Sequence, residues 1–228
     1  MSDGIHAPPR HGAGLPEASM NGAASPGVES RLGSLARGAR EPKPDRERCE
    51  LCAAVLAERH PHLVELGSRT VLRSCSACAV LFDDRRAGGG RYRRVTGRRQ
   101  RVSPVMAEDT WPELGVPVGL AFFTRRSADG AVRAHYPGAL GVAEAAVDPG
   151  TWERLTRENP VVATAEPDVE ALLVCRANGL WEHWIVGLDA CYALAAIVRR
   201  DWRGFGGGEE AWASIRRFFQ GLARPERR

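Results

Sequence analysis

The sequence predicts an α+β protein in which a small cysteine-bearing module precedes an antiparallel sheet with helices packed on one face. Two Cys-x-x-Cys pairs, Cys49–Cys52 and Cys75–Cys78, indicate the module. Two Asx-Gly dipeptides, each between short apolar segments, indicate two hairpins. Stretches with apolar residues at helical spacing follow each hairpin and indicate the helices.

The composition is typical of a globular protein with one domain or two small ones. The 228 residues are 43% hydrophobic and 26% charged, with a formal net charge of +4. No apolar run reaches the roughly 18 residues of a membrane span. Residues 1–30 also lack the continuous apolar stretch of a secretory signal. We therefore expect a cytoplasmic protein, in which such cysteine pairs bind metal rather than form disulfides.

Residues 1–45 are rich in Ala, Gly, Pro, Ser and Glu, and they contain few large apolar side chains. Such a segment cannot bury enough surface to offset the entropy lost on ordering it. We expect a disordered tail, and no function follows from it.

Residues 46–83 are predicted to form a zinc-ribbon or rubredoxin-like module. Each Cys-x-x-Cys pair places two thiolates on one tight turn, and two such turns supply the four tetrahedral ligands of a structural metal. The segments 62–66 and 69–73 alternate around Gly67-Ser68 and predict a hairpin that carries the second pair back to the first. Because a module of this size has a small core, metal binding should be its main source of stability.

Zinc is the expected metal and iron the alternative, since four thiolates suit both. Ala53 and Ala79 stand where rubredoxins usually carry glycine, and Phe82 is the one aromatic residue near the pairs in sequence. Both departures favour zinc. His60 and His62 lie between the pairs, but neither is needed as a ligand. The predicted ligands are Cys49, Cys52, Cys75 and Cys78.

Residues 84–102 are predicted to form an arginine-rich linker. A basic run beside a zinc module could bind the phosphates of a nucleic acid or dock a protein partner. A solvated linker, partly paired with acids of the second domain, is the simpler interpretation, because Tyr92 is the one aromatic residue among the arginines. The arginines are Arg85, Arg86, Arg91, Arg93, Arg94, Arg98, Arg99 and Arg101.

Residues 103–224 are predicted to form the α+β domain. The segments 118–123 and 131–136 flank the turn Asp129-Gly130, and the segments 169–176 and 180–186 flank the turn Asn178-Gly179. A helix should begin after Asp148-Pro149, which supplies an N-cap and a proline at the first helical position. A second helix, capped by Asp189, is expected to run to about residue 202, and a third should follow Gly206-Gly207-Gly208.

No catalytic constellation is recognisable in this domain. Cys175 and Cys191 are expected to be buried and inert. A nucleophile made of Cys191 and His183 is conceivable, but no nucleophile elbow or oxyanion loop accompanies it. The glycine runs lack the Lys-Ser/Thr of a phosphate loop. We therefore predict that the protein is not an enzyme.

Several segments together resemble an uncharacterised bacterial family. They are the two cysteine pairs and the segments 88–93, 116–123, 135–137, 166–174 and 189–192, and the resemblance covers about residues 46–222. Members of that family are typically encoded among genes for NiFe-hydrogenase subunits and their accessory proteins. The resemblance implies an auxiliary role in making or supporting such an enzyme. It implies a hydrogenase subunit or accessory protein as the partner, and it assigns no catalytic residues.

Three functions follow from these observations. The first is a metal-binding accessory protein with a structural zinc and a partner-binding α+β domain. The second is a rubredoxin-like iron electron carrier. The third is a nucleic-acid-binding protein that uses the segment 85–101.

Overall fold

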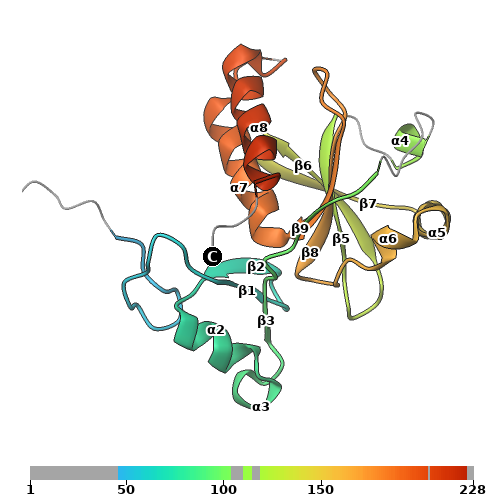
Figure 1. Cartoon of the computed structure of the whole chain (residues 1–228). Helices are drawn as coiled ribbons and strands as arrows, with labels where there is room; N and C mark the ends of the chain where they lie inside the picture. The colour runs from blue at the N-terminus through green and yellow to red at the C-terminus, as the bar shows by residue number, and fades with distance from the viewer. Residues whose placement is uncertain (1–45, 104–109, 115–118, 205, 225–228) are drawn as a thin grey trace, which may run out of the picture. The chain divides into compact units, whose positions relative to one another are not determined.

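The computed structural model describes residues 46–103, 110–114, 119–204 and 206–224 (Figure 1). The described residues belong to one compact unit that starts at Arg46. The predicted disordered tail, residues 1–45, lies outside the described residues. Within the described ranges, the helices are all too short or too polar to cross a membrane.

A three-stranded antiparallel sheet forms the cysteine-bearing part of the chain, with the strand order β2-β1-β3. In β1, Leu63 pairs with Leu72 of β2 on one side and with Arg94 of β3 on the other. The predicted hairpin is therefore present, and its left-handed turn residue is Arg69, with φ 58°. The elements of this part are β1 (His62–Glu65), β2 (Thr70–Arg73), α2 (Ser76–Asp83), α3 (Arg85–Gly88) and β3 (Tyr92–Arg94).

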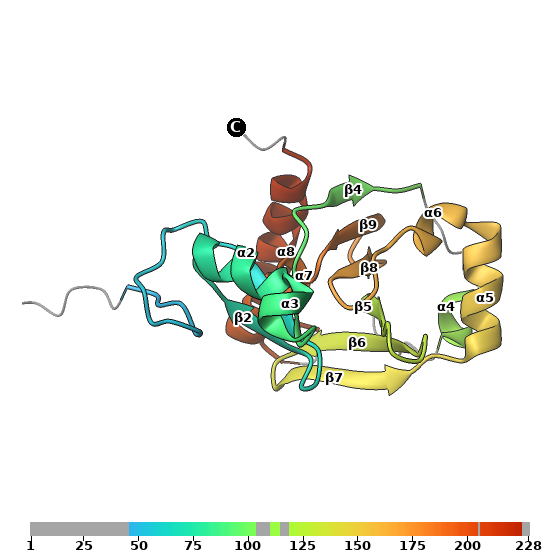
Figure 2. The ribbon, with the colours of Figure 1, turned by 90° about the horizontal axis from the view of Figure 1, so that it is seen from below.

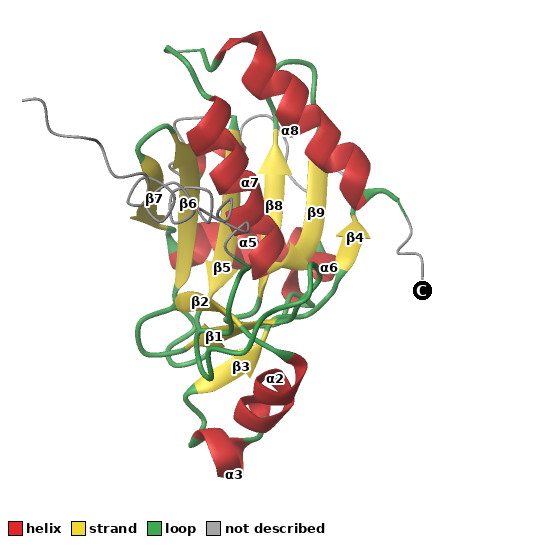
Figure 3. Cartoon of the chain, turned by 90° about the vertical axis from the view of Figure 1, so that its left-hand side faces the viewer, coloured by secondary structure: helices red, strands yellow, loops and turns green. Residues whose placement is uncertain are grey.

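A six-stranded antiparallel sheet forms the larger part, with the strand order β4-β9-β8-β5-β6-β7 (Figure 3). The predicted α+β class with antiparallel pairing is confirmed. The short helix α4 (Thr110–Glu113) precedes β5. The strands are β4 (Arg99–Arg101), β5 (Leu120–Arg125), β6 (Val132–Gly138), β7 (Gly141–Ala146), β8 (Glu170–Cys175) and β9 (Glu182–Gly187).

Helices cover both faces of this sheet, which corrects the prediction that they pack on one face (Figure 2). Phe122 packs in a core with α7 (Leu188–Asp201) and α8 (Gly208–Leu222). Phe123, the next residue, packs on the other face against Leu155 of α5 (Pro149–Glu158), where α6 (Pro160–Ala163) also contributes. The burial of β8 explains why both faces are covered, because all six of its residues are buried. After Glu170, its residues 171–175 are an unbroken apolar run, which is typical of a strand covered on both sides.

The two predicted turns differ in their geometry. Asn178 and Gly179 both have positive φ, 50° and 73°, as a type I′ turn requires. In the other hairpin, Gly130 is left-handed, while the N–H of Arg126 donates to the carbonyl of Ala131 across a longer loop. The strand β7, which continues this hairpin, was not predicted. Its sequence, rich in glycine and alanine, has a low β-propensity.

The helix starts follow local rules. The Asp148 side chain accepts a hydrogen bond from the N–H of Thr151, so it caps α5 as predicted. The helix α7 begins two residues earlier than predicted: Gly187 is its N-cap, and Asp189, the predicted cap, lies in its first turn. The helix α8 buries Trp212, one of several apolar residues on its inner side.

The arginine-rich segment 84–102 differs from the linker that we predicted, because it contributes a strand to each sheet. Arg93 in β3 pairs with Val64 of β1, and Gln100 in β4 pairs with Ile185 of β9. Val95, between the two strands, is buried in the same core as Val64 and Phe122. The two parts of the chain are therefore joined through a shared core.

Candidate metal centre

The first cysteine pair lies on a tight turn before the hairpin. The N–H of Cys49 donates to the carbonyl of Ala54, and the N–H of Ala53 donates to the carbonyl of Cys49. Ala53 has φ 59°, in the left-handed region that favours glycine. The position at which rubredoxins usually carry glycine therefore has the same backbone requirement here, and alanine meets it at some conformational cost.

The second pair lies at the start of a helix, which differs from the second tight turn expected of a zinc ribbon or rubredoxin-like module. Cys75 is the N-cap of α2, and its Sγ accepts a hydrogen bond from the N–H of Cys78 at 3.4 Å. The unpaired N–H groups and the dipole of a helix N-terminus stabilise negative charge. The N–H of Cys78 is one such group, and it points at Sγ of Cys75.

The hairpin brings the two pairs together. At the end of β2, the N–H of Glu50 donates to the carbonyl of Arg73, and the N–H of Arg73 donates to Oε2 of Glu50 at 2.6 Å. The guanidinium of Arg73 also contacts the carboxylates of Glu50 and Glu47. These contacts hold the first pair against the end of β2, immediately before Cys75.

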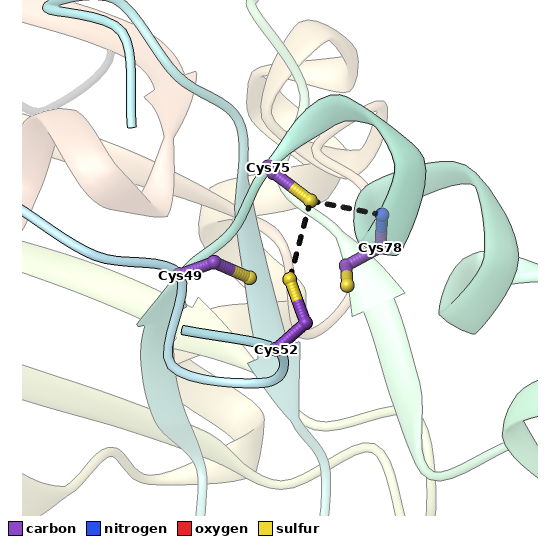
Figure 4. Close-up of side chains that lie close together, drawn as sticks. All are labelled: Cys49, Cys52, Cys75 and Cys78. Atoms are coloured by element: carbon purple, nitrogen blue, oxygen red, sulfur yellow. Dashed lines mark hydrogen bonds between the residues drawn. The ribbon is translucent and has the colours of Figure 1, made fainter. Parts of the chain in front are cut away.

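The four cysteine side chains point toward one another (Figure 4). Their sulfur atoms all lie within 4.8 Å of one another, and the Sγ atoms of Cys52 and Cys75 are 3.7 Å apart. A tetrahedral ion with metal–sulfur bonds of about 2.3 Å separates its ligands by about 3.8 Å. Cys49 and Cys78 are buried and Cys52 is exposed, and none forms a disulfide. The four residues can hold one metal ion, as the spacing predicted.

The ionisation of the cluster is uneven. Burial raises the pKa of the Cys49 thiol, but the backbone N–H groups of Cys75, Leu51 and Cys52 outweigh it and lower the pKa to about 6. Burial and the neighbouring thiols raise the pKa of Cys78. The first proton therefore leaves easily and the last does not, because negative sulfurs crowd together. A cation at their centre would remove that repulsion.

The two histidines of the module lie outside the cysteine cluster, as expected. Their rings are 4.9 Å apart. His60 lies beside Glu47, and Nδ1 of His62 is 3.2 Å from Oδ2 of Asp189 in α7. Among the described residues, the metal-ligand group contains the four cysteines and neither histidine.

The arginines of the segment 85–101 are largely engaged within the chain. Arg93 pairs with Glu166 and Asp168, and further ion pairs join the segment to acids elsewhere: Arg91–Glu65, Arg98–Glu170 and Arg101–Glu182. Arg85, Arg86 and Arg94 are exposed. The expected pairing with acids of the second domain is present. Part of the segment's positive charge is therefore neutralised within the chain.

The conceivable nucleophile of Cys191 and His183 is not assembled. Cys191 is buried in the core beneath α7 and α8, and burial raises its pKa well above the ordinary value. His183 is two residues from Ile185, which faces the opposite core, and residues two apart in a strand share a face. Cys175 is also buried, with its pKa raised to about 12 by burial.

One polar group was missed by sequence reasoning. His135, Thr124 and Glu144 come together on the α7 side of the large sheet, with Nε2 of His135 2.8 Å from Oγ1 of Thr124. His135 is opposite Glu144 in the β6–β7 pairing. The alternation of β6 could have suggested a buried histidine, but its partner lies on a strand that the sequence did not reveal.

Comparison with protein families identifies one match. A family model described as "Family of unknown function (DUF5947)" matches residues 48–226. A search of curated proteins and a search of solved structures each found no match.

Proposed function

The chain belongs to this family of unknown function, and we propose that it is a metal-binding accessory protein whose four clustered cysteines hold one zinc ion. The observation that carries the proposal is the convergence of four thiol sulfurs within 4.8 Å. Four protein ligands complete a tetrahedron and leave no open position for a substrate, so the site is structural rather than catalytic. The zinc ligands would be Cys49, Cys52, Cys75 and Cys78.

The zinc would act by joining two elements that the backbone connects only through the hairpin. Cys49 and Cys52 belong to the tight turn, whereas Cys75 and Cys78 belong to the start of α2. Zinc sites in small peptides supply an apparent binding free energy of roughly 10 to 16 kcal/mol. That energy would stabilise the folded cysteine-bearing module beside the large sheet.

Metal analysis of the purified full chain tests the proposal. We expect a colourless protein with one zinc per chain when zinc and iron are both supplied during expression. The variant Cys78→Ser should lose the metal, whereas Cys175→Ala, which changes a cysteine outside the cluster, should keep it. A coloured protein with one iron per chain would contradict zinc and favour an electron carrier.

The proposed accessory role is support of NiFe-hydrogenase maturation or assembly in the cytoplasm. It rests on the family resemblance, together with the absence of an assembled nucleophile among the described residues. We propose that the protein works by binding a hydrogenase subunit or accessory protein, not by catalysis. The exposed arginines Arg85, Arg86 and Arg94 are candidate partner contacts.

A gene deletion tests this role in a host that makes such an enzyme. Deletion should lower hydrogenase activity and subunit processing, and the wild-type gene should restore both. A gene carrying Cys78→Ser should restore less, if the zinc site supports the role. Unchanged activity and processing in the deletion strain would overturn the accessory role and leave the metal site untouched.

A further inference from the structure

A small cavity with several charged residues in its lining lies between the β1–β2 hairpin and the large sheet. The hairpin contributes Leu66 and Arg69, the sheet contributes Arg133 and His135, and α7 contributes Tyr192. Its volume is about 30 Å³, whereas one water needs about 10 to 15 Å³. The cavity is therefore too small for a nucleotide or a peptide, and it suits an ion of a few atoms.

His135 is a buried polar side chain without a full set of hydrogen bonds. Its side chain is 5% exposed, and its ring is stacked on that of Phe122 at 4.6 Å. Nε2 is satisfied by Oγ1 of Thr124 at 2.8 Å. Nδ1 is 3.4 Å from a carboxylate oxygen of Glu144, yet it makes no hydrogen bond in the described part of the chain. A buried nitrogen of this kind normally has a partner.

The carboxylates around the cavity are already matched by cations. Glu144 pairs with Arg69 at 3.2 Å. Oδ2 of Asp168, also in the lining, lies 3.9 Å from Nη1 of Arg93, and its Oδ1 accepts from the N–H of Ser127. Both lining carboxylates therefore lie near a cation, although Oδ2 of Asp168 makes no hydrogen bond within the described part of the chain.

Arg133, by contrast, has no counterion. Within the described ranges, its half-buried guanidinium makes no hydrogen bond or ion pair, and its charge is one of the influences that lower the pKa of His135. The cavity consequently carries surplus positive charge, and a partly buried unpaired cation favours an anion beside it.

Donors for such an anion are present on two sides of the cavity. The hydroxyl of Tyr192 has no hydrogen-bond partner among the residues that the structure describes, and its ring is held edge-on against Phe122. If the hydroxyl of Thr124 donates to Nε2 of His135, Nδ1 carries the ring proton and is a donor. The guanidinium of Arg133 supplies a planar fork that matches two oxygens.

We propose that this cavity binds a small oxyanion, held by the guanidinium of Arg133 and the hydroxyl of Tyr192, with Nδ1 of His135 as a third donor. The shared chemistry is two or more oxygens on one central atom, as in a carboxylate or a phosphate. Because the lining comes from both the hairpin and the large sheet, the bound anion stabilises their contact. The proposal is independent of the zinc site, since none of its residues belongs to the cysteine cluster.

Titration of the metal-loaded full chain with acetate and with inorganic phosphate tests the proposal. Calorimetry or amide NMR should show saturable binding of at least one of them, at an ionic strength kept constant with chloride. The thermal midpoint should rise on binding. Binding of acetate alone identifies a carboxylate site, and binding of phosphate alone identifies a site for tetrahedral oxyanions.

Two variants and a matched control assign the binding to this cavity. Arg133→Gln should weaken binding by about tenfold or more, because a charge-assisted pair is lost. Tyr192→Phe, which keeps the ring packing, should weaken anion binding by a smaller factor. This variant provides the test if Arg133→Gln fails to fold. Arg157→Gln, on exposed α5 at the opposite face, should bind as wild type does. Saturation by neither anion, or equal affinity in wild type and both cavity variants, would overturn the proposal.

Discussion

At the scale of single residues, the arginine-rich segment supplies a positive charge that stabilises a buried carboxylate. The carboxylate of Glu170 is 5% exposed, and three donors satisfy it: Nη1 of Arg98 at 3.0 Å, Oγ1 of Thr96 at 2.7 Å and the N–H of Glu166 at 2.9 Å. Two of these donors come from the segment that the sequence presented as a basic run. One cation of the segment, Arg98, thus neutralises a buried acid at the start of β8.

We predict that Arg98→Ala lowers the free energy of unfolding by about 3 to 5 kcal/mol, because the buried carboxylate of Glu170 loses its cation. Urea unfolding of both proteins measures the change. Arg94→Ala is the control, since that side chain is exposed, and it should change stability by about 0.5 kcal/mol or less. Equal losses in the two variants would contradict a structural role for Arg98.

A second residue-scale prediction concerns pH and His183. Burial, followed by the charge of Arg176, lowers the pKa of His183 to about 4, and neither ring nitrogen has a partner among the described residues. The unfolded chain has the ordinary pKa near 6.5, so it binds more protons than the folded chain between these values. Stability should therefore fall as the pH drops from about 6.5 toward 4.

The variant His183→Leu should lose less stability than wild type over the same pH interval, whatever its stability at neutral pH. Urea unfolding of both proteins across that interval gives the two slopes. The cysteines and His135 titrate in both proteins, so the difference between the slopes isolates His183. Identical slopes would show that His183 does not titrate with a lowered pKa.

At the scale of elements, the junction of β9 and α7 depends on a missing side chain. A Cβ on Gly187 would lie 2.2 Å from the carbonyl of Thr96 and 2.8 Å from Oδ1 of Asp189. The carbonyl belongs to backbone and cannot swing away. The close approach lets the segment between β3 and β4 run directly beneath the start of α7.

We predict that Gly187→Ala destabilises the protein by about 1 to 3 kcal/mol through overpacking. Gly221→Ala in α8 is the matched control, because a Cβ there meets nothing within 4 Å, and alanine in a helix is favoured over glycine by up to about 1 kcal/mol. Thermal unfolding should thus move in opposite directions for the two variants. A stabilised Gly187→Ala protein would refute the steric argument.

At the scale of the whole molecule, the two sheets share one core. Val64 of the cysteine-bearing sheet is buried with Phe122 of the large sheet and Leu188 of α7. The cysteine turn and α2 lie farther from this core, and α2 exposes Val80 and Leu81. The part of the chain closest to the metal site is consequently the part that the common core supports least.

We therefore predict that removing the metal with a chelator loosens the molecule locally. Amide hydrogen exchange should lose protection in the cysteine turn 49–54 and in α2, whereas β5 and β8 keep most of theirs. Addition of zinc should restore the lost protection. Uniform loss of protection across both sheets would instead mean that the metal holds the whole fold.

Much of the local structure was predictable because its causes are neighbours in the chain. The Asn178-Gly179 turn, the Asp148 cap of α5 and the four cysteine ligands all follow from spacing over a few residues. The strands β3, β4 and β7 were not predicted. Each is short or poor in β-formers, and each exists because a partner strand supplies its hydrogen bonds.

The sequence by itself determined the α+β class, the hairpin turns and the residues able to hold a metal, because these depend on backbone preferences and on thiol chemistry. The tertiary structure alone decided that helices cover both faces of the large sheet and that the arginine-rich segment pairs with distant acids. It also decided that Arg133, His135 and Tyr192 line one cavity. Such contacts join residues far apart in the chain, so no local pattern encodes them.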